Sequence, residues 1–236
     1  MAGPGRAIAL AALTALAAWA VFPSDEQAPP RPPEQRPALA LLTSLPLVFA
    51  EEFGLERTGS PALGRLEQRY NVVPVAVADA AQLAGKRMLL MAHPRAQPAE
   101  VLVELDRWVR DGGRLLLLAD PRLDWPSERP LGDLLRPPPA FADTGLLRRW
   151  GMSLSGPWPA GPAKAGNGTR EVMTSAPGKI ESSSCTVLGD GFVARCKIER
   201  GRVTVIADAD FLDVGGEGRE ENLELLVDEL GHLETR

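Results

Sequence analysis

Histidine, cysteine and tyrosine are scarce in this chain of 236 residues, which contains two histidines, two cysteines and one tyrosine. So few histidines make a histidine-rich metal site or a Ser-His-Asp triad difficult to assemble. The sequence also lacks a G-x-S-x-G elbow, a Walker loop, a G-x-G-x-x-G motif after its first predicted strand, and an H-E-x-x-H motif. We therefore predict no catalytic residue, no metal and no cofactor.

An excess of basic residues is missing as well. The formal net charge is −5 and the isoelectric point is near 5.2. Proteins that bind nucleic acid present a lysine- and arginine-rich face, so we expect no nucleic-acid partner. The apolar content of 44% is that of an ordinary globular protein, and the length suits one or two domains.

The amino end contains the longest apolar run. Residues 7–22 are apolar and follow the positive charge of Arg6. The run is shorter than the roughly 20 residues of a spanning helix and suits a signal-peptide core, with a small-x-small cleavage motif at residues 18–20; a tilted, uncleaved anchor is the alternative. We predict that residues 1–22 are a signal peptide or membrane anchor and that the rest is periplasmic or otherwise extracytoplasmic.

Residues 23–37 are rich in proline and predict an extended linker, followed by a single α/β domain over residues 38–236. The clearest signal in the domain is Gly112–Pro121, in which two glycines end an amphipathic helix and four leucines lead to Asp-Pro. An apolar run without alternation indicates a parallel strand that is buried on both faces. Further strands are expected at 38–42, 72–77 (an edge strand, because of Pro74), 86–92 and 202–207, and helices at 61–70, 79–83, 98–111, 143–150 and 220–230.

Both cysteines fall in a predicted β-hairpin over residues 184–198, which we expect to be an insertion in the last third of the chain. Its turn is Asp190-Gly191, a favoured type I′ pair. Pairing the strands outward from this turn sets Cys185 opposite Cys196, within disulfide range. Two small buried thiols are the alternative. A disulfide would agree with export, because such bonds persist in oxidising compartments.

Polar side chains follow four predicted strands at the point where each strand ends. If these strands are parallel, their carboxyl ends meet at the sheet edge where open α/β sheets bind ligands. Such a cluster could hold a cation or perform acid-base chemistry; alternatively, each residue caps a turn or helix. The residues of this candidate crevice are Thr43, Ser44, His93, Asp120, Asp208 and Asp210.

The order of motifs resembles the auxiliary domain of gliding-motility-type ABC transport systems and related uncharacterised domains. The resemblance covers roughly residues 38–135 and 200–231. It implies a fold similar to that of class I glutamine amidotransferases, a flavodoxin-like three-layer sandwich with a mostly parallel central sheet. The matching positions are His93-Pro94, Gly112-Gly113-Arg114, Asp120-Pro121, Asp208 and Asp210.

The same resemblance implies a non-catalytic binding or scaffold domain that works through protein partners at the membrane, accessory to an ABC-type transport or envelope system. The amidotransferase nucleophile is a cysteine at a strand-to-helix elbow, whereas this chain has Asp120 at that kind of strand end. The alternative function is a hydrolase, or a sensor of a small ligand or metal, that uses the strand-end carboxylates.

Overall fold

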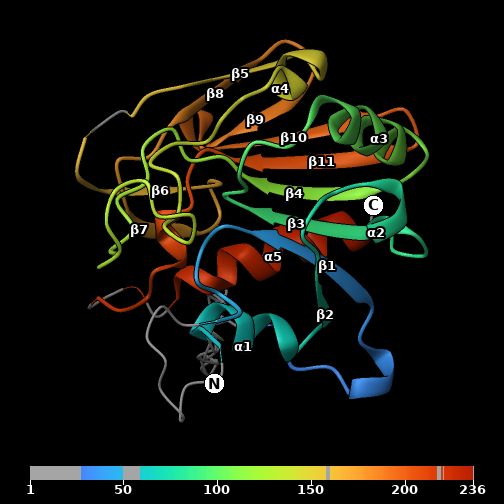
Figure 1. Ribbon diagram of the computed structural model, residues 1–236, viewed down its shortest axis with the longest axis horizontal. Coiled ribbons are helices and arrows are strands. Elements are labelled where there is room, and N and C mark those ends of the chain that lie inside the picture. Colours follow the sequence, from blue (N-terminus) through green and yellow to red (C-terminus); the bar gives the residue numbers. More distant parts are fainter. Residues whose placement is uncertain (1–27, 50–58, 158–159, 217–218, 220, 236) are drawn as a thin grey trace, which may run out of the picture.

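The computed structural model describes residues 28–49, 59–157, 160–216, 219 and 221–235 (Figure 1). The predicted signal peptide or anchor over residues 1–22 lies outside these ranges. Within them, no helix is both long enough and apolar enough to cross a membrane.

The domain is built on a seven-stranded, mostly parallel sheet, which confirms the predicted α/β class. The strand order is β2-β1-β3-β4-β11-β10-β9. The first five strands are parallel, and β10 and β9 extend the sheet as antiparallel strands. The bounds are β1 Ala38–Thr43, β2 Asn71–Pro74, β3 Met88–Ala92, β4 Arg114–Leu118, β9 Thr186–Leu188, β10 Val193–Ile198 and β11 Gly201–Ile206.

Strand β4 lies at the centre of the sheet, between β3 and β11, as its leucine run predicted. Successive strand side chains point to opposite faces, so both faces of β4 need apolar cover. Leu116 and Leu118 belong to the hydrophobic core on one face, and Leu115 and Leu117 to the core on the other. The absence of alternation therefore reflects burial on both sides.

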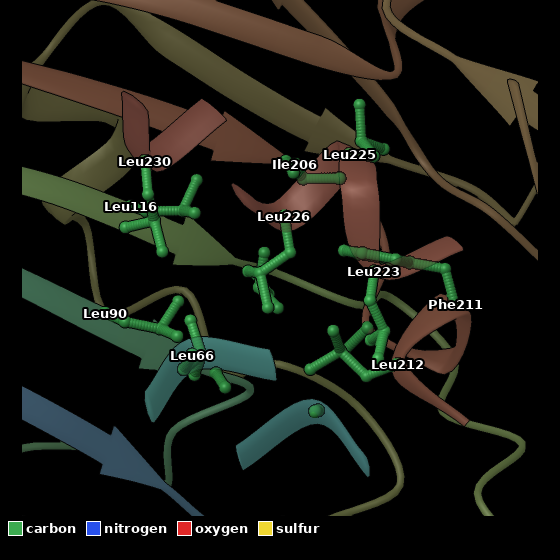
Figure 2. Close-up of a cluster of buried hydrophobic side chains, with 14 of the residues drawn as sticks. Leu66, Leu90, Leu116, Ile206, Phe211, Leu212, Leu223, Leu225, Leu226 and Leu230 are labelled. Carbon is green, nitrogen blue, oxygen red and sulfur yellow. The ribbon is translucent and has the colours of Figure 1, made fainter. Parts of the chain in front are cut away.

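Helices cover both faces of this sheet. On one face α1 and α5 pack against it, and Figure 2 shows Leu66 of α1 and Leu226 of α5 beside Leu90 and Leu116. On the other face, α2 and α3 contribute apolar side chains such as Leu105. The helices are α1 Pro61–Glu67, α2 Ala80–Leu83, α3 Ala99–Arg110, α4 Leu146–Arg149 and α5 Asn222–Thr235, with short 3-10 turns η1 Pro33–Gln35, η2 Gly189–Gly191 and η3 Asp210–Leu212.

Several predicted boundaries were wrong for local reasons. Strand β2 lies at the sheet edge, as Pro74 predicted, but it ends at Pro74 instead of at residue 77. The helix expected over residues 143–150 is reduced to α4, because Gly145 takes a left-handed conformation with φ 96° and its N–H binds the side chain of Asp143. Two small sheets occupy a stretch without clear periodicity: β5 Met152–Ser155 pairs with β8 Lys179–Ser182, and β6 Pro162–Gly166 with β7 Glu171–Ser175.

The described part of the predicted linker, residues 28–37, lies against the domain. Arg31 forms a two-pronged ion pair with Glu234 near the end of α5, with a closest approach of 2.7 Å, and its guanidinium lies 5.4 Å from the Tyr70 ring centre. The carbonyl oxygen of Ala28 accepts a hydrogen bond from Arg65 of α1. This part of the linker is therefore fixed to both helices of one face.

Buried ion pairs attach α5 to its surroundings. The Arg65 guanidinium donates two hydrogen bonds of 2.8 Å to Glu224, and both side chains are nearly inaccessible. Glu229, fully buried, accepts hydrogen bonds from Arg195 of β10 and from Asn167. Residues 167–169, Asn-Gly-Thr, match a glycosylation sequon, but Asn167 is buried and its side chain is bonded to Glu229, so it is not accessible for modification.

The hairpin is not an insertion beside the main sheet but forms its antiparallel edge, β9 and β10. Its predicted register is confirmed, with Leu188 opposite Val193. Asp190 and Gly191 both have positive φ, and the Phe192 N–H donates to the Gly189 carbonyl, as a type I′ turn requires.

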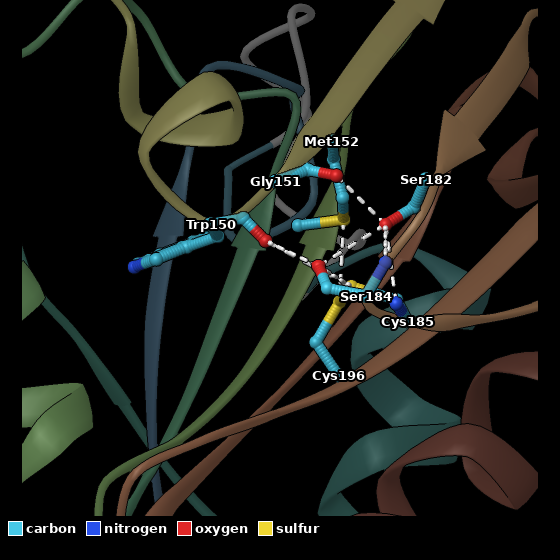
Figure 3. The surroundings of a disulfide bond; sticks show 7 residues. All are labelled: Trp150, Gly151, Met152, Ser182, Ser184, Cys185 and Cys196. Carbon is cyan, nitrogen blue, oxygen red and sulfur yellow. Dashed lines mark hydrogen bonds between the residues drawn. A yellow bond between two sulfur atoms is a disulfide. The ribbon is translucent and has the colours of Figure 1, made fainter.

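The predicted disulfide is present between Cys185 and Cys196, whose Cα atoms are 4.6 Å apart (Figure 3). Figure 3 places it beside Met152, and the Ser184 side chain nearby donates a hydrogen bond to the Trp150 carbonyl oxygen. The bond thus fastens the sheet edge next to α4 and β5.

Reduction of the purified chain is expected to add two hydrogen atoms to its mass, because both cysteines are joined. The double variant Cys185→Ala/Cys196→Ala should lose about 2–3 kcal/mol of unfolding free energy by the loop-entropy argument. Mass spectrometry with and without reductant, and urea denaturation, measure the two effects. An unchanged mass would show that the thiols are free.

Gly113, after α3, has no room for a side chain. A Cβ atom there would overlap the indole ring of Trp108. We expect Gly113→Ala to cost about 1–3 kcal/mol of stability in urea denaturation, because an overpacked site must shift its neighbours. The matched control is Gly64→Ala in the exposed face of α1, where a Cβ meets nothing within 4 Å. Gly64→Ala should stabilise by about 0.5–1 kcal/mol, so equal effects of the two changes would contradict this account.

Candidate functional site

The carboxyl ends of the parallel strands face the left of Figure 1, and all six predicted crevice residues lie at this edge. At the end of β1, the hydroxyl of Thr43 donates to the Ala92 carbonyl oxygen at 2.9 Å. The hydroxyl of Ser44 donates to the carbonyl oxygen of His93. These bonds join the end of β1 to the end of β3. Both hydroxyl protons are therefore used within the fold.

His93 is completely buried, in a left-handed conformation with φ 46°. Its Nε2 lies 2.9 Å from the carbonyl oxygen of Pro138, and because a carbonyl only accepts, Nε2 carries a proton. Its Nδ1 has no hydrogen-bond partner. Burial lowers the pKa of His93, against the bond to Pro138 that raises it, so the neutral ring is favoured.

Asp120 is also completely buried, and its two oxygens accept from two different segments. Oδ1 accepts from the Arg122 N–H at 2.8 Å, and Oδ2 accepts from the Ala209 N–H at 3.0 Å. Burial raises its pKa to about 6, although backbone N–H donors hold it down. The carboxyl joins the chain after β4 to the chain after β11, which is the turn-capping role anticipated as an alternative.

Asp208 and Asp210 complete the cluster, and each has one oxygen without a partner. Oδ1 of Asp208 accepts from the Thr174 hydroxyl at 2.6 Å, and Oδ2 of Asp210 accepts from the Asp124 N–H at 2.8 Å. The remaining oxygens, Asp208 Oδ2 and Asp210 Oδ1, are buried and unbonded. Burial and the neighbouring Asp120 raise the pKa of Asp208 well above its ordinary value and that of Asp210 to about 7.

The six residues therefore form two groups instead of one constellation. One group, at the ends of β1 and β3, bonds to the main chain at the end of β3 and to the loop over it; its members are Thr43, Ser44 and His93. The other group is the three aspartates, which bond to the chain that follows β4 and β11. The nitrogens of His93 make no hydrogen bond to an aspartate. In the part of the chain that the structure describes, no three histidine, cysteine, aspartate or glutamate side chains are arranged to hold a metal ion.

A proline-rich loop, residues 121–140, closes this edge. The Phe141 N–H donates to the Asp120 carbonyl oxygen at 2.7 Å, and the Leu123 N–H donates to the Pro139 carbonyl oxygen at 2.9 Å. Arg95, which follows β3, donates to the carbonyl oxygens of Leu134 and Arg136. The prolines of residues 121–140 favour a long loop here. The sequence did not indicate Arg95, Asp124 or Thr174, because each acts through contacts with segments distant in the sequence.

No protein-family model matches the sequence, and a search of curated proteins also finds no match. Solved structures resemble the fold. The mmIFT52 N-terminal domain is 14% identical, with a TM-score of 0.59 over 84% of this chain and 98% of that one. The exo-β-1,4-mannosidase Op5Man5 from Opitutaceae bacterium strain TAV5 is 14% identical, with a TM-score of 0.51 over 83% of this chain.

The chain spans only 36% of the length of Op5Man5. The β-galactosidase Gan42B has a TM-score of 0.47, and 31% of its length is covered. At such identities the likeness concerns the fold alone. What the site does must be argued from its own residues.

Proposed function

We propose that this chain is a non-catalytic binding or scaffold domain that acts through protein partners, accessory to an ABC-type transport or envelope system. The observation that carries the proposal is the closed strand-end edge. His93, Asp120 and Asp208 are 0% exposed and Asp210 is 3% exposed. A substrate could not reach these side chains without displacing the loop over residues 121–140.

Hydrogen bonds within the fold account for most polar groups of this edge; the exceptions are Nδ1 of His93, Oδ2 of Asp208 and Oδ1 of Asp210. Asp120 and Asp210 accept backbone N–H groups at the start of the covering loop, and Asp208 accepts from Thr174 of β7. Buried polar groups must find partners, and these aspartates supply them where several loops meet. The cluster thus supports a rigid edge, the feature that a scaffold needs.

We further infer that the sheet and its helices form a flavodoxin-like sandwich. The five parallel strands have the order β2-β1-β3-β4-β11, which has the same pattern as the doubly-wound order 2-1-3-4-5. In that pattern ligands bind between the first and third strands. Here that position holds the hydroxyls of Thr43 and Ser44, both bonded to main-chain carbonyls of the β3 end.

The disulfide supports a place outside the cytoplasm. Such bonds persist mainly in oxidising compartments. We propose an extracytoplasmic domain that its amino-terminal segment, residues 1–22, either anchors at the membrane or releases after cleavage.

The raised pKa values of the aspartates favour a second candidate, a hydrolase or a small-ligand or metal sensor. A carboxyl whose pKa lies near 6 or 7 can serve as a general acid at neutral pH. For this function the loop over residues 121–140 would have to open and expose Asp120 and Asp210.

Thermal unfolding of the purified chain separates the two candidates. We expect that magnesium, calcium, manganese and zinc ions leave the midpoint unchanged, and that nitrophenyl glycosides and esters are not hydrolysed. The matched variant is Asp210→Asn, which keeps one oxygen acceptor. Two outcomes would replace the scaffold function with the second candidate. One is a cation that raises the unfolding midpoint of the wild type but not of Asp210→Asn. The other is hydrolysis by the wild type that Asp210→Asn loses. Co-purification from membranes after crosslinking tests the partner directly.

A further inference from the structure

We infer that the loop over residues 121–140 is a self-association surface, and that its occupant is the same loop of a second copy of this chain. This inference goes beyond the proposed function and does not depend on it. It begins with the exposed apolar side chains. Leu131 and Leu134 are each 85% exposed, and Leu135 is 65% exposed. Contiguous exposed apolar residues on a soluble domain mark interaction sites.

The tip of this loop is internally fixed and presents its leucines. The Asp133 N–H donates to the Pro130 carbonyl oxygen, the Leu135 N–H donates to Oδ1 of Asp133, and Arg136 donates to the carbonyl oxygen of Arg129. Main-chain polar groups are thus satisfied within the loop while the leucine side chains remain in water. A surface that is ordered before binding loses little conformational entropy on binding.

A hollow of mixed lining lies directly beside the projecting leucines. It has a volume of about 290 Å³, and its apolar wall includes Trp125 and Pro138 together with Leu131 and Leu134 themselves; its polar lining is Arg95, Ser127, Asp133 and Arg136. The loop therefore carries both projecting leucines and a hollow with an apolar wall that can receive them. A two-fold contact places the same patch on both copies, so the leucines of each copy can fill the hollow of the other.

Charge also favours a second copy over other occupants. The whole chain has a net charge of −5, yet residues 121–140 contain three arginines and three acidic residues. Two copies of this loop can meet without net repulsion, and pairs such as Arg129 and Asp133 can exchange partners across the two-fold axis. Nucleic acid or an anionic membrane would require an excess of positive charge, which the loop does not have.

A contact built on one loop is small, so we expect a weak dimer, with a buried area below about 1,200 Å² in total. Sedimentation velocity of the full chain in a non-ionic detergent, over a concentration series, should show a reversible monomer–dimer equilibrium. The double variant Leu131→Glu/Leu134→Glu should weaken dimerisation at least about tenfold, because it places charges in the contact. The matched control is Val103→Glu on α3, a valine that is 58% exposed and should leave the equilibrium unchanged.

A second measurement is disulfide crosslinking of the full chain. In Leu134→Cys the native cysteines remain joined to each other, and oxidation should link two chains through the new thiol. A chain that stays monomeric at every concentration and does not crosslink would overturn the inference. A dimer that survives Leu131→Glu/Leu134→Glu would overturn it too, because another surface would then hold the copies together. Leucine-dependent binding of a monomer to phosphatidylcholine vesicles would assign the patch to lipid instead.

Discussion

The free energy of unfolding is expected to fall by about 4–6 kcal/mol when the pH rises from about 4 to about 8, because the raised pKa values of Asp120 and Asp210 outweigh the opposing effect of His93. Burial raises the pKa of Asp120 to about 6 and that of Asp210 to about 7, and Asp208 shifts in the same direction. The folded state therefore binds protons that the unfolded chain has already released. Stability is greatest near pH 4 and declines until pH passes the raised pKa values. Urea denaturation across this range measures the slope.

Asp210→Asn should remove part of this slope and stabilise the domain at pH 8. The amide oxygen can still accept from the Asp124 N–H, and the amide carries no charge into the buried cluster. The control is Asp143→Asn on an exposed turn. His93 acts in the opposite direction, because its pKa is lowered and its neutral form is favoured as the pH rises. A profile that is flat, or that rises between pH 5 and 8, would contradict the assignment of buried, protonated aspartates.

Removal of Arg65 is expected to cost about 3–5 kcal/mol, the usual penalty for leaving one member of a buried pair without its partner. Burial alone would raise the pKa of Glu224, but the hydrogen bonds and charge of Arg65 outweigh it and lower that pKa. Arg65→Met retains much of the apolar volume and removes the charge. Urea denaturation at neutral pH measures the loss.

The double variant Arg65→Met/Glu224→Met should recover most of that stability, since no uncompensated charge then remains buried. Lys164→Met is the matched surface control. Lys164 and Glu171 form an exposed pair at 2.6 Å, and such pairs contribute only about 0–1 kcal/mol. If Arg65→Met costs no more than Lys164→Met, the pair between α1 and α5 does not hold them together.

The pattern of apolar residues was sufficient to predict the parallel strands of the sheet, because a strand that is buried on both faces has apolar residues at consecutive positions. It did not show that the hairpin continues the same sheet. The leucines of β4 and the pairing of Cys185 with Cys196 follow from periodicity and from a turn type that fixes register. The small sheets formed by β5–β8 and β6–β7 could not be predicted in the same way. Their strands are only four or five residues long, and even in β7, where Val172 and Thr174 are buried in alternation, the sequence does not alternate between apolar and polar residues.

The candidate site was predicted as one constellation because parallel strands end at a common edge. The structure separates it, since no side chain among the six donates a hydrogen bond to the side chain of another; their partners are main-chain groups and Thr174. Such bonds depend on how residues 121–140 fold over the edge. A loop rich in proline has no periodicity from which that path could be predicted.

The ion pair between Arg31 and Glu234 shows at which edge of the sheet the carboxyl end of the described chain lies. The two residues meet beside the start of β4, because the Glu234 carbonyl oxygen accepts a hydrogen bond from Arg114. The carboxyl end of the described chain therefore lies at the amino-terminal edge of the parallel strands, whereas the leucine-bearing loop lies at the carboxyl edge. At the other end of the described chain, Ala28 lies beside Arg65 and the start of α5. A domain attached to a surface through its carboxyl end would hold those leucines on its far side.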